Sequence, residues 1–122
     1  MKTVLVVDDS RIMRNIVKNT FLEMRIPCGF LEAGNGREAY ELLQEHTVNL
    51  VLLDWNMPEI SGLDFLKMVR SIENYKYLPI VMVTSESAKY NVIEALKNGA
   101  TDYIIKPVNE RKFLEKLSRI PL

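Results

Sequence analysis

Residues 4–10 read Val-Leu-Val-Val-Asp-Asp-Ser, an apolar run that ends in two carboxylates and a hydroxyl. The run is continuously apolar and does not alternate, which is typical of a parallel strand covered on both faces of its sheet. Similar runs lie at residues 50–53, 79–83 and 103–105, with a weaker one at 29–32. The sequence therefore predicts a parallel sheet of five strands.

Segments with helical spacing separate these runs. The predicted apolar stripes are Met13, Ile16, Val17, Thr20 and Met24; Leu63, Leu66 and Val69; Val92, Ala95 and Leu96; and Phe113, Leu114 and Leu117. Asn98-Gly99 is a typical helix stop, because glycine readily adopts the left-handed conformation of a C-terminal cap. Alternating strands and helices with short connections predict a doubly wound α/β fold, and we expect one domain over residues 1–122.

The composition narrows the classes of function. The chain has 122 residues, with 16 basic and 16 acidic side chains, so its net charge is zero and does not favour binding to a nucleic acid or a membrane. No apolar run approaches the roughly 20 residues that span a bilayer, and the N-terminus lacks the pattern of a signal peptide. The single cysteine, Cys28, cannot form an internal disulfide. We therefore expect a cytoplasmic protein without nucleic-acid or membrane partners.

Polar side chains follow four of the predicted strands. They are Asp8, Asp9 and Ser10; Asp54; Thr84 and Ser85; and Lys106 with Pro107. Ligands of open parallel sheets bind at the carboxyl ends of the strands. We therefore expect three carboxylates, a hydroxyl and an ammonium group to meet at one edge of the sheet.

Each of these residues also has a purely structural interpretation. Ser10 and its two acidic neighbours would cap the first helix, and Thr84 or Ser85 would cap the fourth. Asp54 would be a turn residue and Lys106 a solvated charge. Such roles predict no particular combination of residue types, whereas a phosphoryl site requires carboxylates, a hydroxyl and a cation at these positions. The combination favours a site.

The chemistry of the site follows from these residue types. Three neighbouring carboxylates repel one another, and a hard divalent cation with oxygen ligands, such as Mg²⁺, relieves that repulsion. A carboxylate is also a nucleophile that forms an aspartyl phosphate. Phosphoryl transfer needs mainly positioning and charge neutralisation, which a metal ion and Lys106 would supply. Thr84 is placed to donate a hydrogen bond to a phosphoryl oxygen.

Three motifs resemble one family across the whole chain. Residues 4–9 read V-L-V-V-D-D, residues 54–62 read D-W-N-M-P-E-I-S-G, and Lys106-Pro107 follows an apolar run after Gly99-Ala100. Together they resemble the receiver domain of two-component response regulators, above all the stand-alone receivers of chemotaxis. The resemblance implies a flavodoxin-like, three-layer sandwich with strand order 2-1-3-4-5.

The resemblance also implies roles at the metal site. Asp54 would accept a phosphoryl group from a sensor histidine kinase. Asp9, Asp54 and the main-chain carbonyl of Asn56 would bind Mg²⁺, or alternatively Mn²⁺, with Asp8 acting mostly through a bound water. The protein would not be an enzyme, beyond assisting its own phosphorylation and dephosphorylation.

Other positions would form the switch. The resemblance implies that Lys106, beside a cis bond to Pro107, pairs with the phosphoryl group, that Thr84 moves toward it, and that Tyr103 changes rotamer. The face of the fourth helix, fifth strand and fifth helix would then bind a target, for which the flagellar motor switch is one candidate, and a phosphatase is a further candidate partner. Asn56 and Glu86 would tune hydrolysis and give a phosphorylated state that lasts seconds.

Three alternatives stay open at this point. In the first alternative, the chain is a receiver fragment of a larger response regulator, since its last residues suit either a terminus or a linker. In the second, it is a phosphatase with an aspartyl intermediate. Such enzymes of the haloacid-dehalogenase type carry D-x-D after the first strand, whereas this chain has D-D-S-R. In the third, it is a flavin binder, although Asp8 and Asp9 would repel a flavin phosphate.

Overall fold

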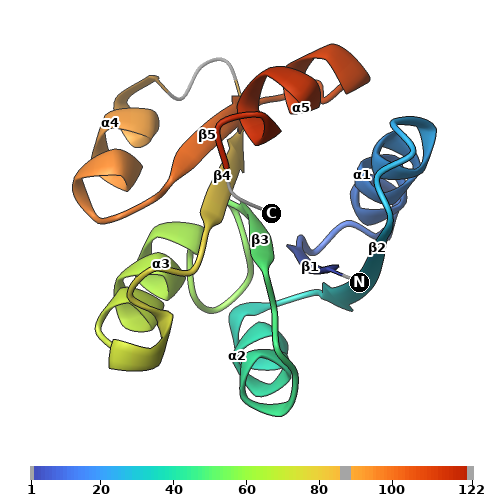
Figure 1. Ribbon diagram of the computed structural model, residues 1–122. Coiled ribbons are helices and arrows are strands. Elements are labelled where there is room, and N and C mark those ends of the chain that lie inside the picture. The colour runs from blue at the N-terminus through green and yellow to red at the C-terminus, as the bar shows by residue number, and fades with distance from the viewer. Residues whose placement is uncertain (1, 86–88, 121–122) are drawn as a thin grey trace.

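The computed structural model describes residues 2–85 and 89–120, which form one parallel sheet flanked by helices (Figure 1). The strands are β1 (Lys2–Val7), β2 (Cys28–Ala33), β3 (Leu50–Asp54), β4 (Ile80–Thr84) and β5 (Asp102–Ile105). The helices are α1 (Arg11–Glu23), α2 (Gly36–Glu45), α3 (Gly62–Arg70), the 3-10 turn η1 (Glu73–Tyr75), α4 (Lys89–Lys97) and α5 (Glu110–Leu117). None of the helices within these residues is long and apolar enough to cross a membrane.

The sheet has the order β2-β1-β3-β4-β5, and every pair of neighbouring strands is parallel. The predicted strand order is therefore confirmed, and all five predicted runs are strands. The observed strands differ from the apolar runs only at their ends, where polar residues such as Lys2 and Asp102 join the ladder. Residues at strand ends take part in the hydrogen-bonded ladder whatever their hydropathy, so an apolar pattern cannot mark these ends.

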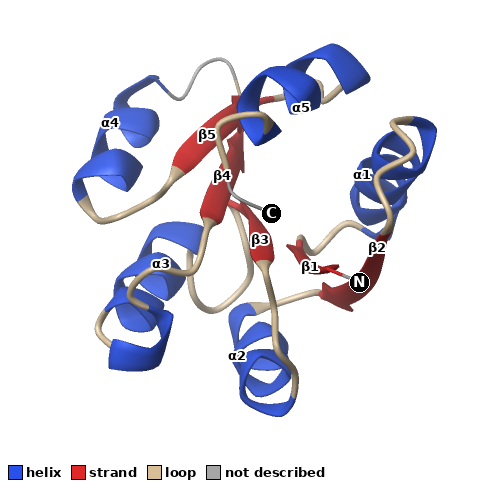
Figure 2. Cartoon of the chain, viewed as in Figure 1, coloured by secondary structure: helices blue, strands red, loops and turns tan. Residues whose placement is uncertain are grey.

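The helices form two layers. α1 and α5 cover one face of the sheet, and α2, α3 and α4 cover the other (Figure 2). Side chains of β1 alternate between the two layers, because Leu5 and Val7 belong to one apolar cluster and Val4 and Val6 to the other. Each of these four side chains is at most 2% exposed, which explains why the run is apolar at every position.

The predicted helical stripes were only partly right. Ile16, Leu96 and Leu114 are 40%, 44% and 52% exposed, although each was expected in the core. Phe21 and Phe65, which the stripes omitted, are fully buried. Spacing gives the period of a helix but not its rotation about its own axis, and the rotation depends on how the helix packs on the sheet. The long aromatic side chains fill the interior at these places.

The ends of the helices agree with local capping rules. Ser10 is the N-cap of α1, and its hydroxyl accepts a hydrogen bond from the Met13 main-chain nitrogen at 3.2 Å. At the other end of the sheet, Gly99 ends the α4 segment with a φ of 101°, in the left-handed region, as the Asn98-Gly99 pair predicted. The capping interpretation of Ser10 is thus confirmed.

Candidate metal and phosphoryl site

The candidate site lies at the carboxyl ends of the central strands. Asp8 follows β1 directly, Asp54 is the last residue of β3, and Thr84 is the last residue of β4. Lys106 follows β5, and its main-chain nitrogen donates a hydrogen bond to the Thr84 carbonyl oxygen at 2.6 Å. Four separate segments therefore place polar residues at one edge of the sheet, as their positions after the apolar runs predicted.

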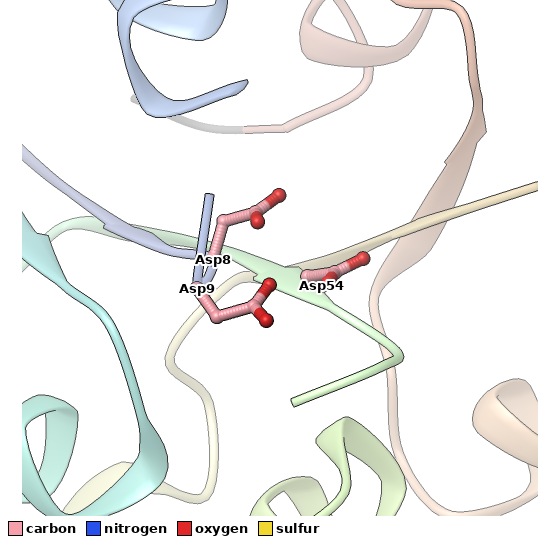
Figure 3. A group of neighbouring side chains, drawn as sticks. All are labelled: Asp8, Asp9 and Asp54. Carbon is pink, nitrogen blue, oxygen red and sulfur yellow. The ribbon is translucent and has the colours of Figure 1, made fainter. Parts of the chain in front are cut away.

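Three acidic side chains meet at this edge. Asp8, Asp9 and Asp54 each offer a carboxylate oxygen, and these oxygens all lie within 4.8 Å of one another. Figure 3 shows that the three side chains approach one another from two segments, with Asp8 and Asp9 adjacent in the chain and Asp54 on the neighbouring strand. Asp8 and Asp54 are only 6% and 5% exposed, whereas Asp9 is exposed.

Lys106 supplies the positive charge of the site. Its ammonium nitrogen lies 3.0 Å from Oδ1 of Asp54 and 3.7 Å from Oδ2 of Asp8. The peptide bond between Lys106 and Pro107 is cis, as the family resemblance implied. The lysine side chain is 28% exposed, so it bridges the buried carboxylates and the solvent. One cation therefore neutralises only part of the charge of three carboxylates.

The electrostatics of the site disfavour the charged carboxylates. Burial raises the pKa of Asp8 above its ordinary value of 3.8, and the negative charges of Asp54 and Asp9 add to the rise, against a hydrogen bond from the Ser10 main chain and the charge of Lys106. Burial likewise raises the pKa of Asp54, with Lys106 opposing. The repulsion expected from the sequence is therefore present in the folded protein.

Local hydrogen bonds hold the acidic segment after β1 in place. Oδ1 of Asp8 accepts a hydrogen bond from the Ser10 nitrogen at 2.8 Å, so Asp8 supports the turn into α1 but does not cap the helix. The guanidinium of Arg14 donates to the Asp8 main-chain oxygen at 2.6 Å and pairs with Glu32 on β2 at 3.0 Å. Sequence analysis missed Arg14, because nothing local in the sequence marks its contact with β2.

Gly62 is a second residue that sequence analysis missed. It begins α3, and its nitrogen donates a hydrogen bond to the Trp55 carbonyl oxygen at 2.8 Å. A Cβ atom at this position would overlap the main-chain carbonyl oxygen of Asp54. Only glycine therefore allows α3 to start this close to the end of β3, which carries Asp54. The glycine at the end of the D-W-N-M-P-E-I-S-G motif was the available signal.

The remaining predicted residues lie in the loop after β3 and on β4 and β5, or outside the described residues. Asn56 is exposed in the loop that follows β3. Thr84 is 4% exposed at the end of β4, and Tyr103 is half-buried on β5 beside Lys116 of α5. Glu86 lies outside the described residues. The site therefore consists of the acidic group with Lys106; Thr84 ends β4 at the same edge of the sheet, and Tyr103 lies on β5, three residues before Lys106.

The donor set fits a hard divalent cation. All three donors are carboxylates, Asp8 and Asp54 are largely buried, and burial raises the pKa of both of these groups. Oxygen donors of this kind suit Mg²⁺, which is commonly bound by one or two carboxylates together with water and phosphate oxygens. A divalent charge would offset the repulsion that Lys106 leaves uncompensated.

The family follows from comparison with known proteins. The sequence model of the response regulator receiver domain matches residues 4–118. The chain therefore belongs to the response regulator receiver family, and receiver domains generally bind Mg²⁺. The family assignment agrees with the strand order and the acidic edge of the sheet, and it disfavours the flavin binder and the phosphatase.

Individual relatives narrow the class further. The chain is 48% identical over 114 residues to chemotaxis protein CheY1 of Helicobacter pylori, which covers 93% of this chain and 91% of that protein. It is 45% identical over 117 residues to a CheY homologue of Campylobacter jejuni, with coverage of 95% and 89%. The high-resolution structure of the chemotaxis response regulator CheY4 of Vibrio cholerae superposes with a TM-score of 0.88 at 35% identity, over 99% of both chains. The protein is a CheY-like phosphorylation switch of a two-component system.

Proposed function

We propose that Asp54 is the residue that accepts the phosphoryl group, from a phosphorylated histidine of a sensor kinase. The observation that carries this proposal is the convergence of three carboxylates and Lys106 at one edge of the sheet. Within the acidic group we choose Asp54, because its Oδ1 accepts a hydrogen bond from the Lys106 ammonium group at 3.0 Å, whereas Asp8 lies farther from that group, at 3.7 Å. Asp8, Asp9, Asp54 and the carbonyl of Asn56 would hold Mg²⁺, with Mn²⁺ as a substitute.

The transfer needs a nucleophile and a place for negative charge. A carboxylate oxygen of Asp54 attacks phosphorus, the bond to the histidine nitrogen breaks, and that nitrogen keeps the electron pair and takes up a proton. Lys106, which pairs with Asp54 at 3.0 Å, then pairs with a phosphoryl oxygen. When bound, Mg²⁺ neutralises the carboxylates and the phosphoryl oxygens.

Loss of the phosphoryl group ends the signal. Water attacks phosphorus and regenerates the Asp54 carboxylate together with inorganic phosphate. Asn56, two residues after Asp54 and exposed, would influence the rate of this hydrolysis. Glu86 is assigned the same influence from the sequence alone. We expect a phosphorylated state that lasts seconds, so the protein assists its own dephosphorylation without turning over a separate substrate.

The response to phosphorylation would reach a partner through α4, β5 and α5. The Thr84 hydroxyl would bond a phosphoryl oxygen, and Tyr103 would turn toward the interior in response. Exposed apolar side chains lie on the two helices of this face, and they are Tyr90, Ile93, Leu96 and Leu114. A downstream target would bind here, with the flagellar motor switch as the candidate that the chemotaxis relatives suggest. A phosphatase would be a further partner.

Phosphorylation with a small phosphodonor tests the assignment of Asp54. Acetyl phosphate or phosphoramidate with Mg²⁺ should add one phosphoryl group to the wild-type protein, measured by intact-protein mass spectrometry. Asp54→Asn should gain no mass, since the amide is not a nucleophile for phosphorus. Asp64→Asn, which changes an exposed aspartate on α3, serves as the matched control and should be labelled like the wild type. Equal labelling of wild type and Asp54→Asn would contradict the proposal.

A turnover assay separates the switch from a phosphatase. We expect p-nitrophenyl phosphate to be hydrolysed at no more than a stoichiometric level by the purified protein with Mg²⁺. Sustained turnover that disappears in Asp54→Asn would instead favour an enzyme that uses an aspartyl phosphate as an intermediate.

A further inference from the structure

Lys116 of α5 contacts the ring of Tyr103 on β5. Its ammonium nitrogen lies 4.2 Å from the centroid of the tyrosine ring and 3.2 Å from Oδ1 of Asp102. The same oxygen of Asp102 accepts a hydrogen bond from the Tyr103 main-chain nitrogen at 2.8 Å. The ring, the ammonium group and the carboxylate therefore form one compact unit that joins β5 and α5.

The contact fixes the side of the sheet on which the ring lies. Neighbouring side chains of a strand point to opposite faces, and Ile104 is buried with Phe113 in the cluster beneath α1 and α5. Tyr103 packs against the other cluster, beneath α2, α3 and α4. Since β5 is the last strand of the sheet, an ammonium group from α5 reaches the ring of Tyr103 only around the open edge of that strand. The ring therefore lies at the edge of the sheet.

Partial burial strengthens the contact. The side chains of Lys116 and Asp102 are 17% and 16% exposed, so water screens their charges only in part. An ammonium group over the face of an aromatic ring is stabilised by the ring's electron distribution, and more so when it is desolvated. The ion pair with Asp102 keeps the flexible lysine side chain over the ring. Rotation of Tyr103 away from the edge would lose this contact.

Lys112, the other half-buried lysine of α5, has different partners. Its ammonium nitrogen donates to the carbonyl oxygens of Ile105 and Pro107, each at 2.9 Å. It therefore holds the main chain on both sides of Lys106 and is not the cation over the ring. Arg111 on the same helix is exposed and offers a matched cation away from the ring.

We propose that Lys116, fixed by Asp102, is a positioning residue that holds Tyr103 at the edge of the sheet and so opposes the phosphorylated state. This inference rests on the proposed role of Tyr103 in the switch. A ligand shifts an equilibrium between two conformations only by its differential affinity for them. Because the ammonium group contacts the ring at the edge of the sheet and rotation of the ring inward would break this contact, removal of the ammonium group should raise the population of the inward position and the affinity for a phosphoryl group.

The position of the ring is measured first. The variants are Lys116→Met, which keeps the length of the side chain without its charge, Lys116→Arg, which keeps a cation, and Arg111→Met as the control. Ring carbons of ¹³C-labelled tyrosine are observed by NMR, and Tyr103→Phe assigns the signal among the five tyrosines of the chain. We expect the Tyr103 signal to move in Lys116→Met and to stay near its wild-type position in the other two. An unmoved signal in Lys116→Met overturns the proposal.

Affinity for a phosphoryl analogue is measured next. Beryllofluoride with Mg²⁺ is titrated, and the fluorescence of Trp55, which adjoins Asp54 in the chain, reports binding. We expect Lys116→Met to bind beryllofluoride about two- to fivefold more tightly than the wild type, whereas Lys116→Arg and Arg111→Met bind like the wild type. Equal affinity in Lys116→Met, despite a moved ring signal, would overturn the proposal.

The two measurements also separate this inference from the proposed function. Asp54→Asn should show no saturable response to beryllofluoride. If the wild type showed none either, the assignment of Asp54 would fail, while the NMR signal would still decide whether Lys116 holds the ring. If the wild type responds saturably to beryllofluoride but the Tyr103 signal does not move in Lys116→Met, only the role of Lys116 is overturned.

Discussion

At the scale of single residues, Asp8 is a largely buried carboxylate of the candidate site, and its burial disfavours its charged form. Its side chain is largely buried, close to two other carboxylates, and its pKa is raised first of all by burial. The folded protein therefore binds this proton more tightly than the unfolded chain does. As the pH rises above the ordinary pKa of 3.8, the charged carboxylate costs the folded state free energy.

We expect Asp8→Asn to be more stable than the wild type at neutral pH in the absence of divalent metal. The amide keeps an oxygen for the hydrogen bond from Ser10 and removes one negative charge. The melting temperature should rise by about 4 °C at about pH 7, and the gain should shrink toward about pH 3, where the wild-type carboxyl is protonated. Thermal melts across this pH range measure the difference.

The matched control is Glu41→Gln, which removes an exposed carboxylate on α2. It should leave the melting temperature within about 1 °C of the wild type at every pH. A wild type that melts at or above the temperature of Asp8→Asn at neutral pH would contradict the account of repulsion at this site.

At the scale of elements, Arg70 connects the end of α3 to two loops. Its guanidinium donates to the Gly99 carbonyl oxygen at 2.8 Å and to the Tyr75 carbonyl oxygen at 2.7 Å. A longer contact of 3.5 Å reaches the hydroxyl of Thr101, just before β5. Burial lowers the pKa of Arg70. One side chain thus joins α3, η1 and the connection from α4 to β5.

Arg70→Met should lower the free energy of unfolding by about 2 kcal/mol, because main-chain carbonyl groups lose hydrogen bonds from a charged donor. Lys67→Met, which changes an exposed cation one turn earlier on α3, should change it by less than about 0.5 kcal/mol. Urea unfolding followed by circular dichroism compares the two variants. A similar small effect of both would show that the contacts of Arg70 add little to the attachment of α3.

At the scale of the whole molecule, metal binding and folding are linked. The acidic residues of the site come from two distant segments, the turn after β1 and the end of β3, so their arrangement exists only in the folded chain. A ligand that binds only the folded state stabilises it, by about 2.7 kcal/mol at a concentration one hundred times its dissociation constant. The proposed Mg²⁺ site therefore makes a prediction about global stability.

Mg²⁺ should raise the melting temperature of the wild type in a concentration-dependent way. Asp54→Asn should lose most of this increase, because the variant lacks one of the proposed ligands. The Glu41→Gln control should respond like the wild type. Scanning calorimetry with increasing Mg²⁺, and with chelator as the zero point, provides the measurement. Equal stabilisation of wild type and Asp54→Asn would argue against a metal site that includes this carboxylate.

Sequence reasoning predicted the sheet and the acidic edge because both depend on local patterns. Asp8, Asp54 and Lys106 were found because polar residues that follow buried parallel strands must emerge at one edge. Arg14 and Gly62 were missed because their importance lies in contacts with other segments, which no single stretch of sequence records. The buried face of each helix depends on the rotation of the helix against the sheet. For this reason the predicted apolar stripes did not include Phe21, which is fully buried.

Lys106 also has a mechanical part in the fold. It follows an edge strand of four residues, and its ammonium group reaches carboxylates at the ends of β1 and β3, toward the middle of the sheet. The ion pairs therefore hold the edge strand β5 to the ends of the central strands β1 and β3, in addition to balancing charge. A substitution at this position alters two properties together, the chemistry of the acidic site and the attachment of β5. A loss of phosphorylation in a Lys106 variant can come from the altered acidic site or from a loosened β5. The stability of the variant therefore has to be measured before the loss is assigned to phosphoryl transfer.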